Sequence, residues 1–158
     1  MNISHRAAQA EDYAQAHQLI RELAIYENAE QEVELSLEEF IKDATASPPA
    51  FQLQVALLDE KQVIGMALYY EIYSTWKGRI VYLDDLVVTE QYRRAGVGTI
   101  LLHHVIAYAR ERRARQVRWH VLDWNEPAIQ FYQSIGAKPM DGWTGYRMSG
   151  ETLLRFGS

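Results

Sequence analysis

The segment from Val81 to Thr99, VYLDDLVVTEQYRRAGVGT, constrains the fold of this chain more than any other. Its residue pattern predicts a buried apolar strand, then a polar turn with an Arg-Arg pair and a Gly-x-Gly, and then the start of a helix. A turn of this composition directs several backbone N–H groups to one spot, at the positive end of a helix dipole. Such a spot binds phosphate or pyrophosphate, so the segment predicts a site for a nucleotide-tailed cofactor.

Length and composition set limits on the kind of protein. With 158 residues, of which 48% are hydrophobic and 23% charged, the chain predicts a single globular domain over residues 1–158. Its apolar runs are shorter than the ~20 residues of a membrane span. Residues 1–13 lack the apolar core of a secretory signal, so we expect a cytoplasmic protein with no membrane partner.

The same composition argues against several kinds of site. The chain has no cysteine, which excludes thiolate zinc sites and cysteine nucleophiles. No His, Asp and Glu residues have metal-ligand spacing, so no metal is expected. The net charge of −5 argues against a nucleic-acid partner.

The pattern of apolar residues predicts a mixed order of strands and helices. Ser36 and Glu39 form a capping-box pattern that opens the second helix, and Asn125 can cap the fourth. Helices are expected over 11–26, 36–46, 96–113 and 125–135. Strands are expected over 3–7, 51–58, 63–73, 79–89 and 117–122, with one or two more up to Leu154. This order predicts an α/β (α+β) fold.

The motif R-x-x-G-x-G lies in the turn that precedes the third expected helix. Gly96 and Gly98 remove side chains, so that oxygen atoms can approach the backbone, and Arg93 or Arg94 can add a charge-assisted bond to a phosphate. A glycine pair can equally be only a turn. The absence of Gly-Lys-Ser/Thr disfavours a nucleoside-triphosphate loop, and the absence of a third glycine disfavours a dinucleotide fingerprint.

Two separated motifs together resemble a known family. The R-x-x-G-x-G turn is followed by Asn125-Glu126-Pro127-Ala128, Phe131-Tyr132 and Gly136-Ala137. In this order they resemble the GNAT superfamily of acetyl-coenzyme A-dependent N-acetyltransferases, over residues 6–147. Within it the chain looks most like the diamine (spermidine/spermine) and thialysine N-acetyltransferase group. The shared phrases are Tyr26-Glu27, Trp76 with Gly78, Tyr82-Leu83-Asp84-Asp85, Trp124-Asn125-Glu126-Pro127 and Gly145-Tyr146-Arg147.

The resemblance implies a mixed central sheet of six to seven strands flanked by about four helices. The sheet is expected to splay where acetyl-CoA binds, because family members present free N–H groups of one strand to the acetyl and pantetheine arm. The residues that match cofactor-binding positions are Leu86, Val87, Val88, Arg93, Arg94, Ala95, Gly96, Val97, Gly98, Thr99, Asn125 and Tyr132.

The resemblance also assigns the chemistry. Tyr132 matches the family's general acid, which protonates the departing thiolate, although it could be a core aromatic residue. Asp84 matches the position proposed as the base, directly or through water. Asp85 matches a substrate-binding acid. Adjacent residues of a strand point to opposite faces, so the two carboxylates are not expected to share one task, and a salt-bridged or edge position is the alternative.

The acceptor site is expected to be acidic and aromatic. The residues that match substrate-binding positions are Tyr26, Glu27, Trp76, Asp84 and Asp85. An acidic run from Glu27 to Glu39 would attract a cation, although such runs are often solvated faces. Ser74 and Thr144 stand where polyamine enzymes would have further acids, which favours a shorter diamine or a lysine-like amino acid such as thialysine. Three of the five histidines, His103, His104 and His120, are interpreted as surface or packing residues.

The sequence therefore predicts an N-acetyltransferase that moves the acetyl group of acetyl-CoA to a primary amine by direct attack in a ternary complex. The expected acceptor is a small cationic amine: a diamine, a polyamine or a thialysine-like amino acid. A homodimer is expected by analogy. The alternatives are a protein or peptide amine, an aminoglycoside, or a non-catalytic acyl-CoA-binding module.

Overall fold

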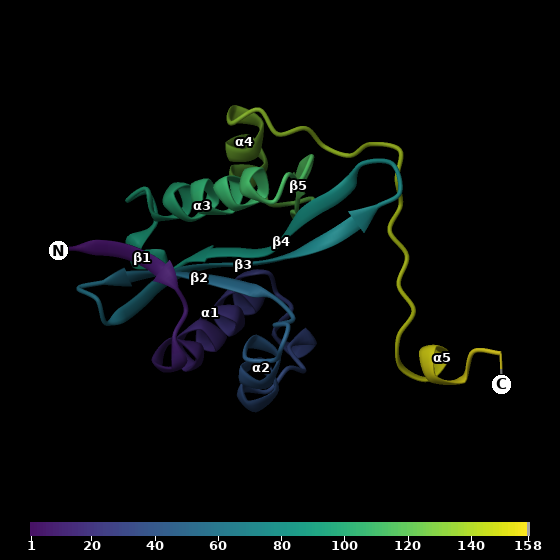
Figure 1. The fold of residues 1–158 in the computed structure, drawn as a ribbon, viewed down its shortest axis with the longest axis horizontal. Helices are drawn as coiled ribbons and strands as arrows, with labels where there is room; N and C mark the ends of the chain where they lie inside the picture. Colours follow the sequence, from purple (N-terminus) through teal and green to yellow (C-terminus); the bar gives the residue numbers. More distant parts are fainter. Residues whose placement is uncertain (158) are drawn as a thin grey trace. The chain divides into compact units, whose positions relative to one another are not determined.

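A five-stranded mixed sheet organises the first part of the chain in the computed structural model, which describes residues 1–157 (Figure 1). The strands lie side by side in chain order, the first four antiparallel and the last parallel to its neighbour. They are β1 (Ile3–Ala7), β2 (Gln52–Leu58), β3 (Gln62–Ser74), β4 (Gly78–Val88) and β5 (Gln116–Arg118).

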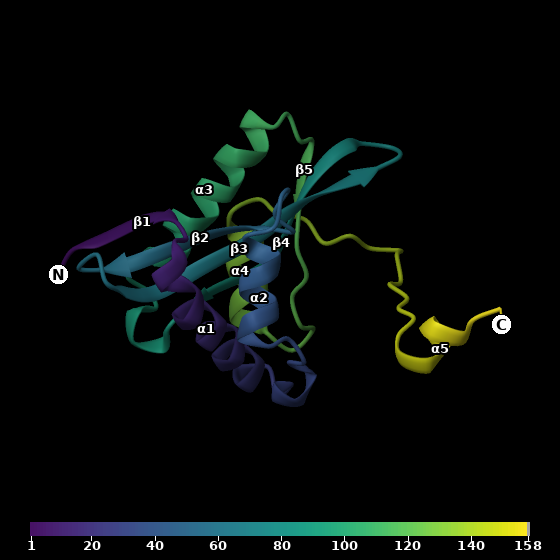
Figure 2. The same ribbon diagram turned by 60° about the horizontal axis from the view of Figure 1, so that its bottom comes forward.

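Helices cover both faces of this sheet (Figures 1 and 2). Helices α1 (Tyr13–Tyr26) and α2 (Leu37–Ala44) pack on one face, and α3 (Val97–Glu111) packs on the other. Short 3-10 turns lie at Ala10–Asp12, Glu30–Glu32 and Glu90–Tyr92. Two clusters of buried apolar side chains, one on each face, make the core, so the sheet is apolar on both sides as the run at the end of β4 indicates.

The predicted capping box is confirmed at the start of α2. The backbone N–H of Glu39 donates to Ser36 Oγ (3.1 Å), and the backbone N–H of Ser36 donates to Glu39 Oε2 (2.9 Å). These reciprocal bonds satisfy N–H groups that a helix start leaves without intrahelical partners.

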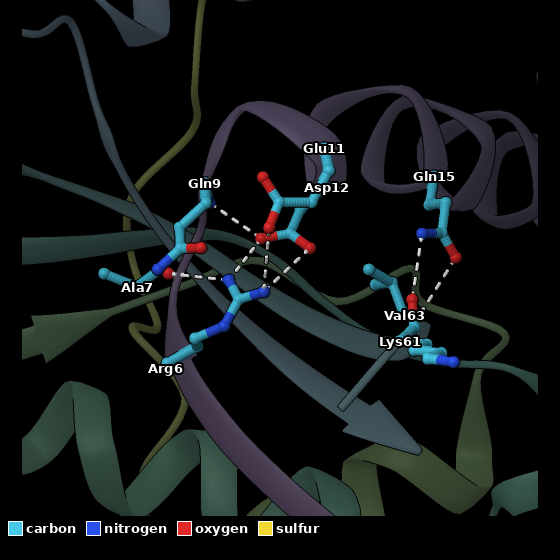
Figure 3. Close-up of polar contacts among 8 residues, drawn as sticks. All are labelled: Arg6, Ala7, Gln9, Glu11, Asp12, Gln15, Lys61 and Val63. Carbon is cyan, nitrogen blue, oxygen red and sulfur yellow. Dashed lines mark hydrogen bonds and ion pairs between the residues drawn. The ribbon is translucent and has the colours of Figure 1, made fainter. Parts of the chain in front are cut away.

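Polar contacts fix the start of α1 to the sheet (Figure 3). The Arg6 guanidinium donates to the buried carboxylate of Asp12, which also accepts the backbone N–H of Gln9 at 2.7 Å. One turn further on, the Gln15 amide donates to the carbonyl of Lys61 (3.2 Å) and accepts the N–H of Val63 (3.0 Å). These bonds connect the start of α1 to β1 and β3 and so fix the direction of the helix. Tyr26 and Glu27 lie at its other end.

The chain divides into two compact units, Met1–His120 and Val121–Ser158. The second contains α4 (Glu126–Ser134) and α5 (Gly150–Arg155). The expectation of one domain over the whole length stays a prediction. In residues 1–157 no helix is long and apolar enough to cross a membrane.

The predicted strands beyond Gly136 are wrong for the part of the chain that the structure describes. A strand needs a neighbour for its backbone groups, and no ladder in residues 1–157 includes this segment. Gly142 and Gly150 have positive φ angles (85° and 58°), which an extended strand does not use, and a helix occupies Gly150–Arg155. The sheet thus has five described strands instead of six to seven, with five α-helices instead of about four.

Candidate active site

Strand β4 runs past its neighbour β5, so that beyond Tyr82 this edge of β4 has no strand partner within residues 1–157. The two strands pair only where Ile80 to Tyr82 lie opposite Gln116 to Arg118, whereas β4 continues to Val88. Its other edge stays paired with β3 as far as Val88. The expected strand over 117–122 is accordingly shorter, ending at Arg118. Leu86, Val87 and Val88 lie on this extension, the part of the sheet where the family resemblance implies a splay.

A β-bulge changes the orientation of the two aspartates on this extension. Leu68 pairs with Asp85 and Tyr69 pairs with Leu83, so that Asp84 is an extra residue with no partner in β3. The Asp84 carboxylate accepts a hydrogen bond from the Tyr70 hydroxyl at 3.2 Å. Asp85 lies on the same face, because its partner Leu68 belongs, like Tyr70, to the cluster under α1 and α2. The expectation that the aspartates face opposite sides is wrong, since a bulge interrupts strict alternation.

The acidic side chains on this face carry unbalanced negative charge. Burial, with the charges of Asp84 and Glu27, raises the pKa of Asp85 from 3.8 to about 7. Burial also raises the pKa of Glu27, at the end of α1. Burial and the two aspartates raise the pKa of both Tyr70 and Tyr82. A cation bound on this face would lower these pKa values, so the face favours a positively charged ligand.

The pKa of Asp85 predicts how stability depends on pH. A carboxyl group whose pKa is raised by folding binds more protons in the native state than in the unfolded state between about pH 4 and pH 7. Its contribution to the free energy of unfolding therefore falls as the pH rises through this window. We expect Asp85→Asn to remove this fall and to stabilise the unliganded protein at pH 8, by at most about 4 kcal/mol, with little change at pH 4.

Urea unfolding of the parent and of Asp85→Asn at both pH values measures this effect. The exposed Asp43, on α2, provides the matched control, because Asp43→Asn removes a carboxylate that water solvates. Equal stability differences for Asp85→Asn at pH 4 and pH 8 would contradict the raised pKa of Asp85.

Two tyrosines and a histidine to which the sequence assigns no role in the site also lie on this face. The rings of Tyr70 and Tyr82 are neighbours across β3 and β4, with centroids 5.5 Å apart. The Tyr82 hydroxyl is hydrogen-bonded to Nδ1 of His120, which follows the end of β5. His120 is exposed and packs against Tyr82, which agrees with its interpretation as a surface or packing residue. The alternation of side chains along β3 and β4 could have predicted that both tyrosines lie on the side of the sheet opposite α3. It could not have predicted the contact with His120.

The turn before α3 has the conformation that an anion-binding turn needs. Arg94 and Gly96 both have positive φ angles (67° and 81°), and Gly96 is the N-cap residue of a 15-residue helix. The first N–H groups of that helix, from Val97 to Thr99, lie before the first intrahelical bond, from Ile100 to the carbonyl of Gly96 (3.0 Å). Together with the helix dipole, they form a place for a phosphate group.

Contacts on both sides hold this turn in place. Arg93 donates from Nε to the carbonyl of Val88 (3.2 Å), and its guanidinium lies over the Tyr26 ring, 5.2 Å from the centroid. These contacts join the turn to the end of β4 and to the end of α1. On β3, a side chain at Gly65 would meet Val97 Cγ1 and the carbonyl of Val87 at 3.1 Å, so this glycine permits the close packing of α3. The structure thus brings Tyr26 to the turn.

Trp76 is one predicted site residue that the structure does not bring to this face. Trp76 lies in the turn between β3 and β4 and is 78% exposed. Gly78, where β4 begins, is six residues before Asp84, about 20 Å along an extended strand. Asn125 and Tyr132 belong to the second unit. Asn125 is the N-cap residue of α4, but its predicted capping bond is wrong: its side chain makes no cap hydrogen bond within residues 1–157, and only its carbonyl accepts, from Ile129 at 3.1 Å.

No group of three or more His, Asp or Glu side chains within residues 1–157 has a geometry that could hold a metal ion. The groups that the site offers are carboxylates, phenols, an imidazole and backbone N–H groups. These groups suit proton transfer and the binding of an anion beside a cation.

Comparison with known proteins decides the family. The acetyltransferase (GNAT) family model matches residues 13–137. The chain belongs to this family. Thialysine N-epsilon-acetyltransferase of Mus musculus is 38% identical to this GNAT chain, over 94% of the chain and 93% of the mouse protein. Spermidine/spermine N(1)-acetyltransferase-like protein 1 of Homo sapiens is 31% identical over 94% of the chain, but over only 23% of its own length.

A solved structure supports the GNAT fold independently of sequence. AAC(6')-Iy, in complex with the bisubstrate analogue CoA-S-monomethyl-acetylneamine, superposes with a TM-score of 0.74 and is 16% identical. The match covers 95% of this chain and 100% of that structure. The predicted membership of the GNAT family, the resemblance to the thialysine group and the class of enzyme, an acetyltransferase, are confirmed.

Proposed function

We propose that this GNAT acetyltransferase moves the acetyl group of acetyl-CoA to the primary amine of a small cationic acceptor. The observation that carries the proposal is the Asp84 bulge, which puts Asp84 and Asp85 on one face beside the open edge of β4. Burial, with the charges of Asp84 and Glu27, raises the pKa of Asp85, so a cation bound there would favour its ionised form. An alkylammonium group supplies both the missing charge and the nucleophile.

Acetyl-CoA is proposed as the acetyl donor on two grounds. The turn from Arg93 to Thr99 has the backbone conformation for a pyrophosphate, and the open edge of β4 from Leu86 to Val88 offers N–H groups to a thioester and its pantetheine arm. AAC(6')-Iy, a protein of similar fold, binds an analogue that contains CoA. Asn125 is proposed to bond the pantetheine amide, on family resemblance.

The proposed reaction is direct attack in a ternary complex. The Asp84 carboxylate takes a proton from the ammonium group, directly or through water, and the neutral nitrogen attacks the thioester carbonyl carbon. Negative charge on the carbonyl oxygen is stabilised by N–H groups of the β4 edge. The C–S bond then breaks while the attacking nitrogen loses its second proton to water, and Tyr132 protonates the departing thiolate and regains its own proton from the solvent. The chain has no cysteine, so an acyl-thioenzyme is not part of this route.

The acceptor is proposed to be thialysine, a lysine-like amino acid or a short diamine. The mouse relative is named for thialysine, and Ser74 takes the place of a further acid that would suit a long polyamine. Tyr26 and Glu27, at the end of α1, are proposed to line the acceptor site together with Asp85. Trp76 stays a candidate on family resemblance alone. The homodimer and the cytoplasmic location also stay predictions.

Steady-state kinetics of CoA release test this function. We expect saturable release with thialysine, and initial rates at varied concentrations of both substrates that give intersecting double-reciprocal lines. Parallel lines would contradict direct attack and indicate an acetyl-enzyme. If the protein binds CoA tightly but no amine causes CoA to be released from acetyl-CoA, the chain is better described as an acyl-CoA-binding module.

A further inference from the structure

The contact between Tyr82 and His120 lies where strands β4 and β5 separate. Tyr82 is the last residue of β4 that pairs with β5, and His120 is two residues beyond the end of β5. The Tyr82 hydroxyl is hydrogen-bonded to Nδ1 of His120, and the ring centroids are 5.6 Å apart. The imidazole thus holds the outer end of the Tyr82 side chain at the point where the β4 edge opens.

On its other side, the Tyr82 ring contacts Tyr70, and the two form a continuous aromatic surface. Their centroids are 5.5 Å apart and their planes differ by 34°. We call this surface the tyrosine wall. Its two hydroxyl groups have different partners, since Tyr70 donates to Asp84 at 3.2 Å and Tyr82 meets His120. Both phenols stay protonated at neutral pH, because burial and the aspartate charges raise their pKa values, so Tyr82 can donate to the imidazole.

The tyrosine wall lies beside the two carboxylates of the site. Tyr70 contacts Asp84 directly, and the charges of both aspartates act on both phenols. An aromatic face next to carboxylates attracts an ammonium group through the ring quadrupole and through charge, while its apolar area packs against methylene groups. Such an arrangement fixes the direction of an alkylamine as well as its location.

We propose that His120 is a positioning residue for the acceptor amine: by binding the Tyr82 hydroxyl it fixes the tyrosine wall beside Asp84 and Asp85, so that the acceptor lies along the wall with its ammonium group at the carboxylates. The inference rests on the proposed function, because it assumes a cationic acceptor on this face. His120 itself takes no part in the chemistry. Its effect passes through Tyr82, and for that reason it should act on acceptor binding more than on turnover.

Variants of the two residues test this role through the Michaelis constants. We expect His120→Phe and Tyr82→Phe each to raise the KM for thialysine about tenfold, with kcat and the KM for acetyl-CoA within about twofold of the parent. The double variant should be no worse than either single variant, because both changes remove one interaction. His120→Asn, whose amide oxygen can accept the Tyr82 hydroxyl, should restore most of the affinity.

His103, an exposed histidine of α3, provides the control, and His103→Phe should leave every constant at the parental value. Thermal unfolding checks that each variant folds. If His120→Phe does not fold, the KM values of Tyr82→Phe and His120→Asn test the role of His120. A parental KM for thialysine in Tyr82→Phe or His120→Phe, or additive effects in the double variant, would overturn the role of His120. Inactivity of the parent with all amines would instead overturn the proposed function.

Discussion

Replacing Tyr132 by phenylalanine is expected to lower kcat about 100-fold, with the KM for acetyl-CoA nearly unchanged. The proposed role of this phenol is to give a proton to the thiolate as the C–S bond breaks, an interaction made only as the transition state forms. Loss of such an interaction lowers kcat and kcat/KM together, whereas loss of a binding contact raises KM. Steady-state rates of CoA release with thialysine measure both constants.

Tyr146→Phe is the matched control for this variant, because it removes a phenol hydroxyl from an exposed position of the same unit. We expect the parental rate for it. An unchanged kcat in Tyr132→Phe would remove the acid role from Tyr132, and a raised KM for acetyl-CoA with unchanged kcat would reassign this residue to cofactor binding.

Replacing Asp84 by asparagine is expected to lower kcat/KM for the amine about 100-fold and to abolish the acidic limb of its pH profile. In the parent, the base is active only as a carboxylate, so the rate should fall as the pH drops and the aspartate pair takes up a proton. Burial and the charges of Asp84 and Glu27 raise the pKa of Asp85 to about 7, so Asp85 takes up its proton close to neutral pH. The apparent pKa belongs to the pair, because the two carboxylates interact.

Asp85→Asn separates the two roles. It should raise the KM for the amine more than it lowers kcat, because the Asp84 carboxylate that serves as the base is still present. A parental profile in Asp84→Asn would point to another base. A larger loss of kcat in Asp85→Asn than in Asp84→Asn would transfer the role of base to Asp85.

Local signals in the sequence were sufficient for much of the architecture. The reciprocal bonds of Ser36 and Glu39 are present as their spacing predicts, because a capping box depends on four consecutive residues. The turn at Gly96 has the left-handed backbone that glycine permits, and α3 follows it directly. The run from Leu86 to Val88 at the end of β4 packs into both apolar clusters, and helices cover both sides of the sheet.

Features that depend on distant residues could not be predicted in this way. The bulge at Asp84 arises from the register between Leu68 and Asp85, which no pattern within β4 reveals. The contact between Tyr82 and His120 joins residues 38 positions apart. The missing strands beyond Gly136 show the same dependence, since an apolar or alternating segment forms a strand only where a partner strand is available.

The most direct test of the central claim compares kcat/KM for CoA release with acetyl-CoA over a panel of amines. The panel contains thialysine, lysine, putrescine, spermidine, a lysine-containing peptide and an aminoglycoside. We predict that a small cationic amine, thialysine or a short diamine, gives the highest value, with mass spectrometry showing one acetyl group on the amine. Preference for the peptide or the aminoglycoside, or no release with any member, would contradict the proposed function.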